Sequence, residues 1–198
     1  MSEIQVNKIS PQSGTSITLG DSGDTFTIPS GATITNSGTA TGFGESNTPY
    51  FEVKLSGTSD FGDQVRTKIP FNTERFDSAN DFDSSTNYRH TPQTAGKYIY
   101  QLVVYGLSSN SANSNVKGIE AYIDKNGSSV QVNEFDYTDN PIRQAQCVAT
   151  VTIDMNGSSD YVEFYGTVNT VDGANGRFSA YTMARGWRLT SWVIYQIK

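Results

Sequence analysis

Short stretches of alternating apolar and polar residues, separated by turn residues, run along most of this chain of 198 residues. No window of about 11 residues has the i, i+3, i+4, i+7 apolar spacing of an amphipathic helix. Aromatic residues make up 12% of the chain, which also holds 18 glycines, and this composition favours strands and turns. We therefore expect an all-β protein with minimal helix.

The front of the chain differs from the rest, because more than half of residues 11–44 are Ser, Thr or Gly. Alternating pieces at residues 16–19, 25–28 and 32–35 are each followed by turn residues. Recurrence at this interval, with one or two large apolar side chains per unit, indicates stacked β rungs. So few apolar side chains cannot offset the entropy of ordering the segment in one chain. We expect copies wound around a common axis as a stalk, with a flexible arm as the alternative.

The remainder of the chain carries nearly all the aromatic residues and predicts a series of strands. They cover residues 51–55, 65–71, 97–105, 118–124, 129–135, 144–153, 161–168, 178–183 and 191–197. The pairs Asn126-Gly127 and Asn156-Gly157 accept the positive φ angles of type I′ turns, so each predicts a hairpin between its flanking strands. This many strands in about 150 residues predicts a β-sandwich or jelly roll.

Several motifs between residues 50 and 198 resemble, in order, those of the C1q/TNF-like trimeric head domain. They are Asn72-Thr73-Glu74, Phe82-Asp83-Ser84-Ser85-Thr86, Tyr88, Thr91 to Tyr100, Ile123 to Val130 with its Asp124-Lys125-Asn126-Gly127 turn, Val162-Glu163-Phe164-Tyr165-Gly166 and Ser191 to Ile197. The resemblance implies a jelly-roll head that forms a homotrimer. The sequence departs from the family pattern in its last strand, which lacks the usual glycine, and at Arg177–Arg188, which reads as an insertion.

The segment from Ile9 to Ile34 resembles segments of tail-fibre-like proteins of marine podophages. Together the two resemblances imply a phage appendage with three parts. We expect a virion-attachment segment over residues 1–12, a trimeric β-rung stalk over 13–48 and a C1q/TNF-like jelly-roll knob over 49–198. The implied partners are two sister chains, other virion proteins at the N-terminus, and a host cell-surface glycan or protein.

Exposed aromatic side chains are the candidates for receptor contact, because rings stack on sugar faces and fill partner pockets. Phe135 and Tyr137 lie in an acidic, loop-like stretch, and Trp187 lies in the apparent insertion; local packing is the alternative for each. Alternation within the predicted strands instead assigns a second set to the core or the trimer axis. This set comprises Tyr98, Tyr100, Phe164, Tyr165, Trp192 and Tyr195.

Catalytic and metal chemistry finds little support in the sequence. The only histidine, His90, reads as part of a solvated loop, and the only cysteine, Cys147, as a buried thiol. Asp77, Asp81 and Asp83 offer oxygen ligands for a weak Ca²⁺ candidate, although such residues also favour turns on their own. No carboxylate pair stands out for glycoside hydrolysis. We expect no enzyme activity, no cofactor and no other metal site.

A net charge of −6 disfavours nucleic acid and anionic membrane surfaces as partners. The N-terminus lacks a signal-peptide pattern, and no stretch is apolar enough to insert in a membrane. We expect a virion protein made in the host cytoplasm, a homotrimeric fibre and knob that mediates host attachment. The alternatives are a capsid fibre or decoration protein without a specific receptor, and a bacterial C1q-like surface lectin.

Overall fold

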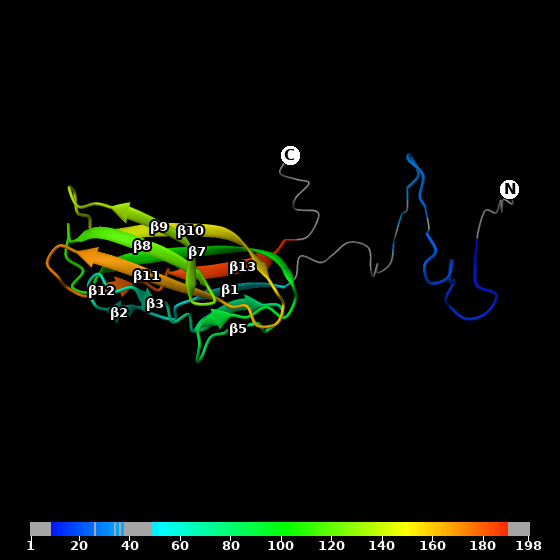
Figure 1. The fold of residues 1–198 in the computed structure, drawn as a ribbon, viewed down its shortest axis with the longest axis horizontal. Helices are drawn as coiled ribbons and strands as arrows, with labels where there is room; N and C mark the ends of the chain where they lie inside the picture. Colours follow the sequence, from blue (N-terminus) through cyan, green and yellow to red (C-terminus); the bar gives the residue numbers. More distant parts are fainter. Residues whose placement is uncertain (1–8, 26, 34, 36, 38–48, 190–198) are drawn as a thin grey trace. The chain divides into compact units, whose positions relative to one another are not determined.

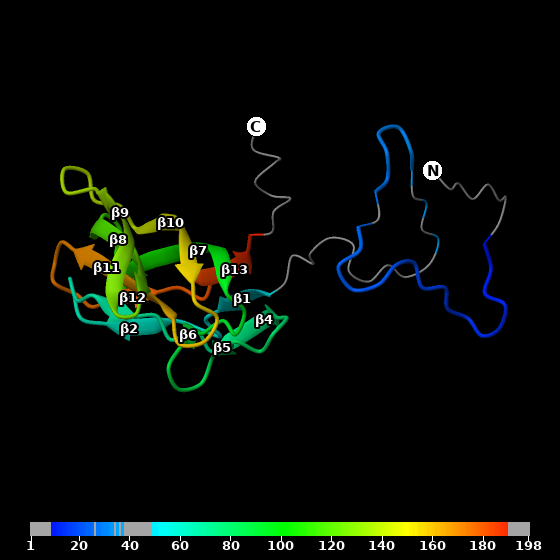
Figure 2. The ribbon, with the colours of Figure 1, turned by 45° about the vertical axis from the view of Figure 1, so that its right-hand side comes forward.

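The computed structural model describes residues 9–25, 27–33, 35, 37 and 49–189, drawn in colour in Figure 1. The chain divides into two compact units, Met1–Phe43 and Gly44–Lys198. All assigned strands of the described residues lie in the second unit, where they form two sheets (Figures 1 and 2).

Sheet A has seven strands. They are β1 (Tyr50–Lys54), β2 (Ser59–Phe61), β4 (Thr73–Asp77), β7 (Gly96–Ser108), β10 (Gln144–Met155), β12 (Gly176–Phe178) and β13 (Met183–Arg188). Sheet B has six strands. They are β3 (Thr67–Lys68), β5 (Phe82–Asp83), β6 (Arg89–His90), β8 (Val116–Lys125), β9 (Ser128–Asp136) and β11 (Val162–Thr170).

The long strand β7 organises sheet A. It pairs antiparallel with β10 along one side and with β12 and β13 along the other. In sheet B, β8 lies between β9 and β11. Strands β9 and β10 thus end their sheets, and they run along the same edge of the sandwich (Figures 1 and 2). The two antiparallel sheets form a jelly-roll sandwich, so the all-β fold class is confirmed.

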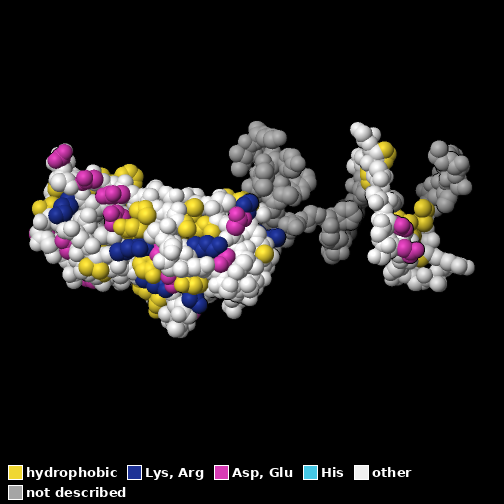
Figure 3. Space-filling view, viewed as in Figure 1, with side chains coloured by type: hydrophobic (Ala, Val, Ile, Leu, Met, Phe, Trp, Pro, Cys, Tyr) yellow, Lys and Arg dark blue, Asp and Glu magenta, His cyan; other side chains and the backbone are white. Residues whose placement is uncertain are grey.

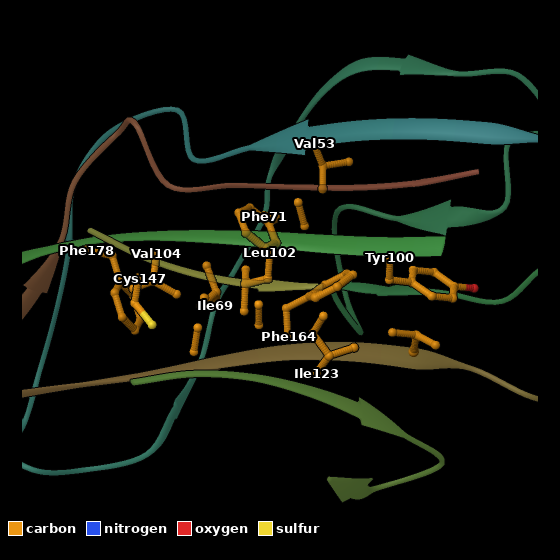
Figure 4. Packing of buried hydrophobic residues seen from close by; sticks show 14 of the residues in the cluster. Val53, Ile69, Phe71, Tyr100, Leu102, Val104, Ile123, Cys147, Phe164 and Phe178 are labelled. Carbon is orange, nitrogen blue, oxygen red and sulfur yellow. The ribbon is translucent and has the colours of Figure 1, made fainter. Parts of the chain in front are cut away.

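The core lies between the inner faces of the two sheets (Figure 4). Every second residue of β7 from Tyr98 to Val104 is fully buried, as strand alternation requires. Phe164 of β11 meets this row from sheet B, with its ring centroid 6.4 Å from that of Tyr100. Cys147 is also fully buried, and burial raises the pKa of its thiol to about 11, which confirms the prediction of an inert buried thiol.

The Asn126-Gly127 turn is confirmed, because both residues have positive φ and join the paired strands β8 and β9. The predicted hairpin at Asn156-Gly157 is wrong. Strand β10 belongs to sheet A and β11 to sheet B, so this connection crosses between the sheets. The Asn156 side chain accepts hydrogen bonds from the backbone N–H groups of the following loop, which makes it a loop cap and not a hairpin residue.

Three other strand predictions change. Of residues 65–71, only Thr67–Lys68 form a strand. The predicted strand at 178–183 is divided by a turn between β12 and β13. The apparent insertion at 177–188 is therefore wrong, because these two strands are integral members of sheet A. The predicted strand at 191–197 lies outside the described residues.

The first unit contains two of the three predicted turns, those at residues 20–23 and 29–31, whereas the turn predicted at 36–38 falls largely outside the described residues. Gly20, Gly23 and Gly31 have positive φ, and the Asp24 N–H donates to the Asp21 carbonyl at 3.0 Å. No strand is assigned among the described residues between 9 and 37, and their large apolar side chains are exposed in the single chain. The division into attachment segment, rung stalk and knob stays a prediction.

Gly157 tests the inter-sheet connection. Its φ is +72°, and a Cβ there would lie 2.2 Å from the backbone nitrogen of Ala95. We expect Gly157→Ala to lower the free energy of unfolding by about 2–3 kcal/mol. Gly57→Ala is the matched control, because a Cβ at Gly57 meets no atom within 4 Å. Chemical denaturation of both variants measures the difference, and equal stabilities would contradict this account.

Candidate binding surfaces

The loop between β9 and β10 brings together two of the three predicted receptor-contact residues. The rings of Phe135 and Tyr137 are stacked, with 6.2 Å between their centroids and their planes 21° from parallel. Phe135 is 46% exposed, whereas Tyr137 is partly buried against the core. The Phe135 ring is therefore exposed to solvent, whereas its neighbour Tyr137 is anchored by packing against the core.

Backbone hydrogen bonds fasten this loop to the start of β8. The Tyr137 N–H donates to the Lys117 carbonyl at 2.7 Å, and Ile142 exchanges two backbone hydrogen bonds with Val116. Between these two attachments the chain turns back, with the Asn140 N–H donating to the Tyr137 carbonyl. The β9–β10 loop is thus short, and backbone hydrogen bonds to β8 fix both of its ends.

A polar hollow lies within this loop, which we call the β9–β10 hollow. Its lining consists of Asp136, Tyr137, Thr138, Asp139 and Asn140. Figure 3 shows acidic side chains gathered over this end of the sandwich. Hydrogen bonds from Thr138 lower the pKa of Asp136, so that its carboxylate is charged at neutral pH.

Trp187, the third predicted contact residue, lies elsewhere. It belongs to β13 and pairs across sheet A with Tyr50 of β1 and Ile99 of β7. Its alternation with the buried residues Ala184 and Gly186 places it on the outer face of that sheet. Trp187 therefore lies in a different strand and a different sheet from Phe135, which belongs to β9 of sheet B.

The outer face of sheet A carries a row of large apolar side chains that are exposed or only partly buried. We call it the sheet A face, and its members are Tyr50, Ile99, Val103, Tyr105, Val148, Met183 and Trp187. Strand register groups them in two apolar patches: Val148 pairs with Val103 and Val103 with Met183, whereas Ile99 pairs with Trp187 and Trp187 with Tyr50. A polar row that includes Gln101 and Arg185 lies between the two patches. Exposed apolar patches of this kind are typical of an interaction site.

An ion-paired carboxylate interrupts the sheet A face. Glu52 is only 7% exposed, and its carboxylate lies 2.7 Å from the Arg75 guanidinium and 3.9 Å from that of Arg185. Arg185 stands directly opposite Glu52 across the strands. A charged pair amid apolar side chains constrains how a partner can align.

The edge formed by β9 and β10 exposes apolar side chains as well. Val130 and Val132 of β9 are 42% and 45% exposed, and Val148 of β10 is 37% exposed. The edges of the two sheets are joined here by side chains, because the Asn133 amide donates to the Val148 carbonyl and the Cys147 thiol to the Asn133 carbonyl.

The three carboxylates of the weak Ca²⁺ candidate are occupied by the backbone. Asp77 accepts from the N–H groups of Ala79 and Phe82, and Asp83 accepts from those of the Ser85–Asn87 turn. Those hydrogen bonds hold the pKa of Asp83 far below its usual value. Within the described residues, no group of three or more His, Cys, Asp or Glu side chains could hold a metal ion.

The prediction of a solvated loop at His90 is wrong. The side chain is 1% exposed, stacks on Phe51 at 4.4 Å, and its Nδ1 lies 2.9 Å from the Tyr100 hydroxyl. Burial lowers the pKa of His90 to about 3, so the imidazole is neutral at physiological pH. The cause is the short strand β6, which pairs with both β5 and β11 and draws His90 into the core.

The residues assigned to the core or trimer axis divide in two. Tyr98, Tyr100 and Phe164 are core residues with no exposed surface. Tyr165 instead faces outward from sheet B, where the Arg66 guanidinium lies between its ring and that of Tyr122, at 4.7 and 4.4 Å. Trp192 and Tyr195 lie outside the described residues.

Sequence reasoning missed the Arg66 cluster. The Arg66 guanidinium also pairs with the Asp124 carboxylate at 2.5 Å, and Asp124 is 2% exposed. These partners come from two strands, β8 and β11, that are distant from Arg66 in the sequence, so no local motif indicates them. Because its charge and its faces are already used within the chain, Arg66 stabilises the outer surface of sheet B.

Comparison with known proteins identifies the fold. No protein-family model and no curated protein matches the chain. The crystal structure of murine APRIL is similar over 71% of this chain and 98% of its own, with 8% identity and a TM-score of 0.51. Eiger TNF from S. frugiperda (10% identity, TM-score 0.48) and the globular domain of zebrafish complement 1qA (13%, 0.46) also match over 71% of this chain and at least 90% of theirs.

The second unit is therefore a jelly-roll sandwich of the TNF and C1q type, as the sequence motifs implied. Identities this low define the fold alone. Within the described part of the chain, no helix has the length and apolarity needed to cross a membrane.

His90 gives the unit a measurable response to acid. Its folded-state pKa of about 3 lies below the ordinary histidine pKa of 6.5, so between these two pH values the unfolded chain binds a proton that the folded chain does not. Stability therefore falls as the pH falls below about 6.5, by about 3 kcal/mol at pH 4. Denaturation of His90→Phe at a series of pH values is expected to lack this acid-dependent loss.

Tyr100→Phe is the matched control for His90→Phe. It removes the same hydrogen bond, which costs about 1–3 kcal/mol at every pH, but it retains the buried imidazole. We expect its acid-dependent loss to match that of the unchanged chain. Parallel pH profiles for His90→Phe and Tyr100→Phe would contradict the assignment.

Proposed function

We propose that the chain is the subunit of a homotrimeric fibre and knob of a bacteriophage virion, and that the jelly-roll knob contacts the host surface. The single observation that carries this proposal is the sheet A face, with its apolar side chains Ile99, Val103 and Trp187 on the outside of a folded sandwich. A surface of this kind is costly to leave in water and is covered at low cost by another copy.

A second copy is the favoured occupant for two reasons. The C1q/TNF-like motifs in the sequence imply a trimeric head. In addition, the exposed valines along the β9–β10 edge provide apolar surface that can pack against a sister chain's sheet A face. An interface that joins one surface to a different surface is heterologous, and three such contacts close a ring.

The first unit supports the same assembly independently. Ile9 and Leu19 are 61% and 63% exposed in the single chain, and Ile17 and Ile28 are 44% and 39% exposed. Three chains around one axis would cover these side chains. The likeness of this segment to podophage tail-fibre-like proteins supports a place in the virion, with the first 12 residues as the attachment segment.

Two alternatives predict different behaviour. A capsid fibre or decoration protein would share the trimer but lack a specific receptor. A bacterial C1q-like surface lectin would bind sugars without being part of a phage particle. The jelly-roll knob would act by binding in all three cases, and catalysis has no part in the proposal.

The oligomeric state tests the assembly. We expect light scattering of the full chain to give about three times the subunit mass of 21.6 kDa. Val148→Asp places a charge on the sheet A face beside the β10 edge and is expected to shift the protein to monomers. Circular dichroism reports whether the variant retains its strands.

Val171→Asp is the matched control for Val148→Asp. Val171 follows β11 in a loop, is 54% exposed, and lies outside the sheet A face and the β9–β10 edge. We expect this variant to retain the trimer. A monomeric unchanged chain, or a trimeric Val148→Asp variant, would overturn the proposed assembly.

Competition for adsorption tests the attachment role. Purified full chain, added in excess to host cells, is expected to reduce adsorption of the phage that carries it. The monomeric Val148→Asp variant should compete far less, because three linked weak contacts bind more tightly than one. Undiminished adsorption at saturating protein would favour the capsid fibre without a receptor.

A further inference from the structure

We propose that the β9–β10 hollow, together with the Phe135 ring beside it, is a binding site for a neutral oligosaccharide. This inference deepens the proposed function, on which it rests for the source of the sugar at a host surface. The site consists of an aromatic surface, a set of unused hydrogen-bonding groups and a backbone that is fixed in place.

The aromatic surface is the first part of the site. Tyr137 lines the hollow, and Phe135 continues the ring surface outward at 46% exposure. The two rings are stacked at 21° from parallel, and Phe135 is the exposed member of the pair, so its ring is the aromatic surface open to a ligand. The C–H face of a pyranose is apolar and stacks on aromatic rings. An exposed ring is therefore available for such a contact.

Unused hydrogen-bonding groups are the second part. In the described part of the chain, neither the Asp139 carboxylate nor the Asn140 amide has a hydrogen-bond partner within the protein. Asp139 can accept hydrogen bonds, whereas Asn140 can both donate and accept them, and the hydroxyls of a sugar also do both. A few such groups beside an apolar surface are what fixes the orientation of a small ligand.

Another polar hollow of the unit lacks the exposed ring surface. It lies around β5 and β6 and includes Asp81, Asp83 and Asn87. Asp83 is occupied by the backbone of its own turn, and the Asn87 amide donates to it at 2.7 Å. Phe82, the only aromatic residue in its lining, is 5% exposed. Of these two hollows, the β9–β10 hollow is the one with an exposed aromatic ring beside its polar groups.

Charge and rigidity specify the ligand further. Both charged groups that line the hollow, Asp136 and Asp139, are carboxylates, so sialylated or sulfated sugars would be repelled. The hydrogen bonds of Tyr137 to Lys117 and of Ile142 to Val116 hold the loop in shape before binding. A fixed loop loses little entropy when it binds, which favours recognition by weak contacts.

The experiment is a glycan array probed with the full-length trimer. The array carries neutral hexose and N-acetylhexosamine oligosaccharides beside sialylated and sulfated ones. We expect binding to neutral glycans, and saturation-transfer NMR with the bound glycan should show its ring protons close to the protein's aromatic rings. Binding to acidic glycans alone, or to none, would overturn the inference.

Substitutions locate the site. Phe135→Leu retains apolar bulk without a ring and is expected to weaken binding about tenfold, whereas Phe135→Tyr retains it. Asn140→Ala should weaken binding about fivefold, and its matched control, Asn87→Ala in the second hollow, should not. Unchanged affinity of Phe135→Leu would place the glycan elsewhere and overturn the proposed site.

The same preparations separate this inference from the proposed function. Light scattering reports the trimer for every variant, and adsorption competition reports attachment to the host. If the unchanged trimer competes for adsorption but binds no neutral glycan, the site assignment fails while the fibre-and-knob function stands. If neutral glycan binding persists in a protein that does not compete, the attachment role fails and the sugar site stands.

Discussion

The packing of β7 against β11 is the contact on which the rest of the jelly-roll unit depends. One face of β7 buries Tyr98, Tyr100, Leu102 and Val104, and Phe164 fills the space between the sheets (Figure 4). Burial of these side chains removes a large apolar area from water, at roughly 25 cal/mol per Å². Strand β7 also pairs with β10 on one side and with β13 on the other, so it positions both parts of sheet A.

Strand alternation links this core to the outer surface. When Tyr98, Tyr100 and Leu102 point inward, Ile99, Gln101 and Val103 must point outward. Ile99 and Val103 are apolar although they point outward, and the fold of a single chain does not require this. The sheet A face is a second apolar surface on a strand whose first apolar surface is already buried, which is the physical basis for inferring a partner copy.

The sequence predicted the long strands well because each is a run rich in β-branched and aromatic residues bounded by turn residues, as in β7, β8 and β9. The Asn126-Gly127 turn was also predictable, since its chemistry is local. Sheet membership was not predictable, because Asn156-Gly157 has the same local chemistry but connects two different sheets. Local sequence fixes a turn's backbone angles, whereas long-range pairing decides which sheet the next strand joins.

The candidate sites show the same division between local and long-range information. Phe135 and Tyr137 are two residues apart, so the sequence could group them, whereas the stacking of their rings is seen only in the structure. The burial of His90 escaped the sequence analysis, because strand β6 has only two residues and no periodicity can reveal it. Trp187 was grouped with Phe135 by its apparent exposure alone, and only the register of β13 assigns it to the sheet A face.

The two proposed surfaces share one structural element, and this sharing has a functional consequence. Strand β9 carries both the exposed valines of the edge and the Phe135 ring, and β10 continues directly from the loop that forms the hollow. A trimer that packs along this edge would hold three hollows in a fixed arrangement by the same strands. Once one hollow had bound a sugar, the other two would be held at a high effective concentration near the same surface. Three weak interactions would then give tight overall binding without any new contact. On the proposed assembly, trimer formation and sugar recognition would be coupled through β9 and β10, and loss of the trimer would weaken attachment even where each sugar site is intact.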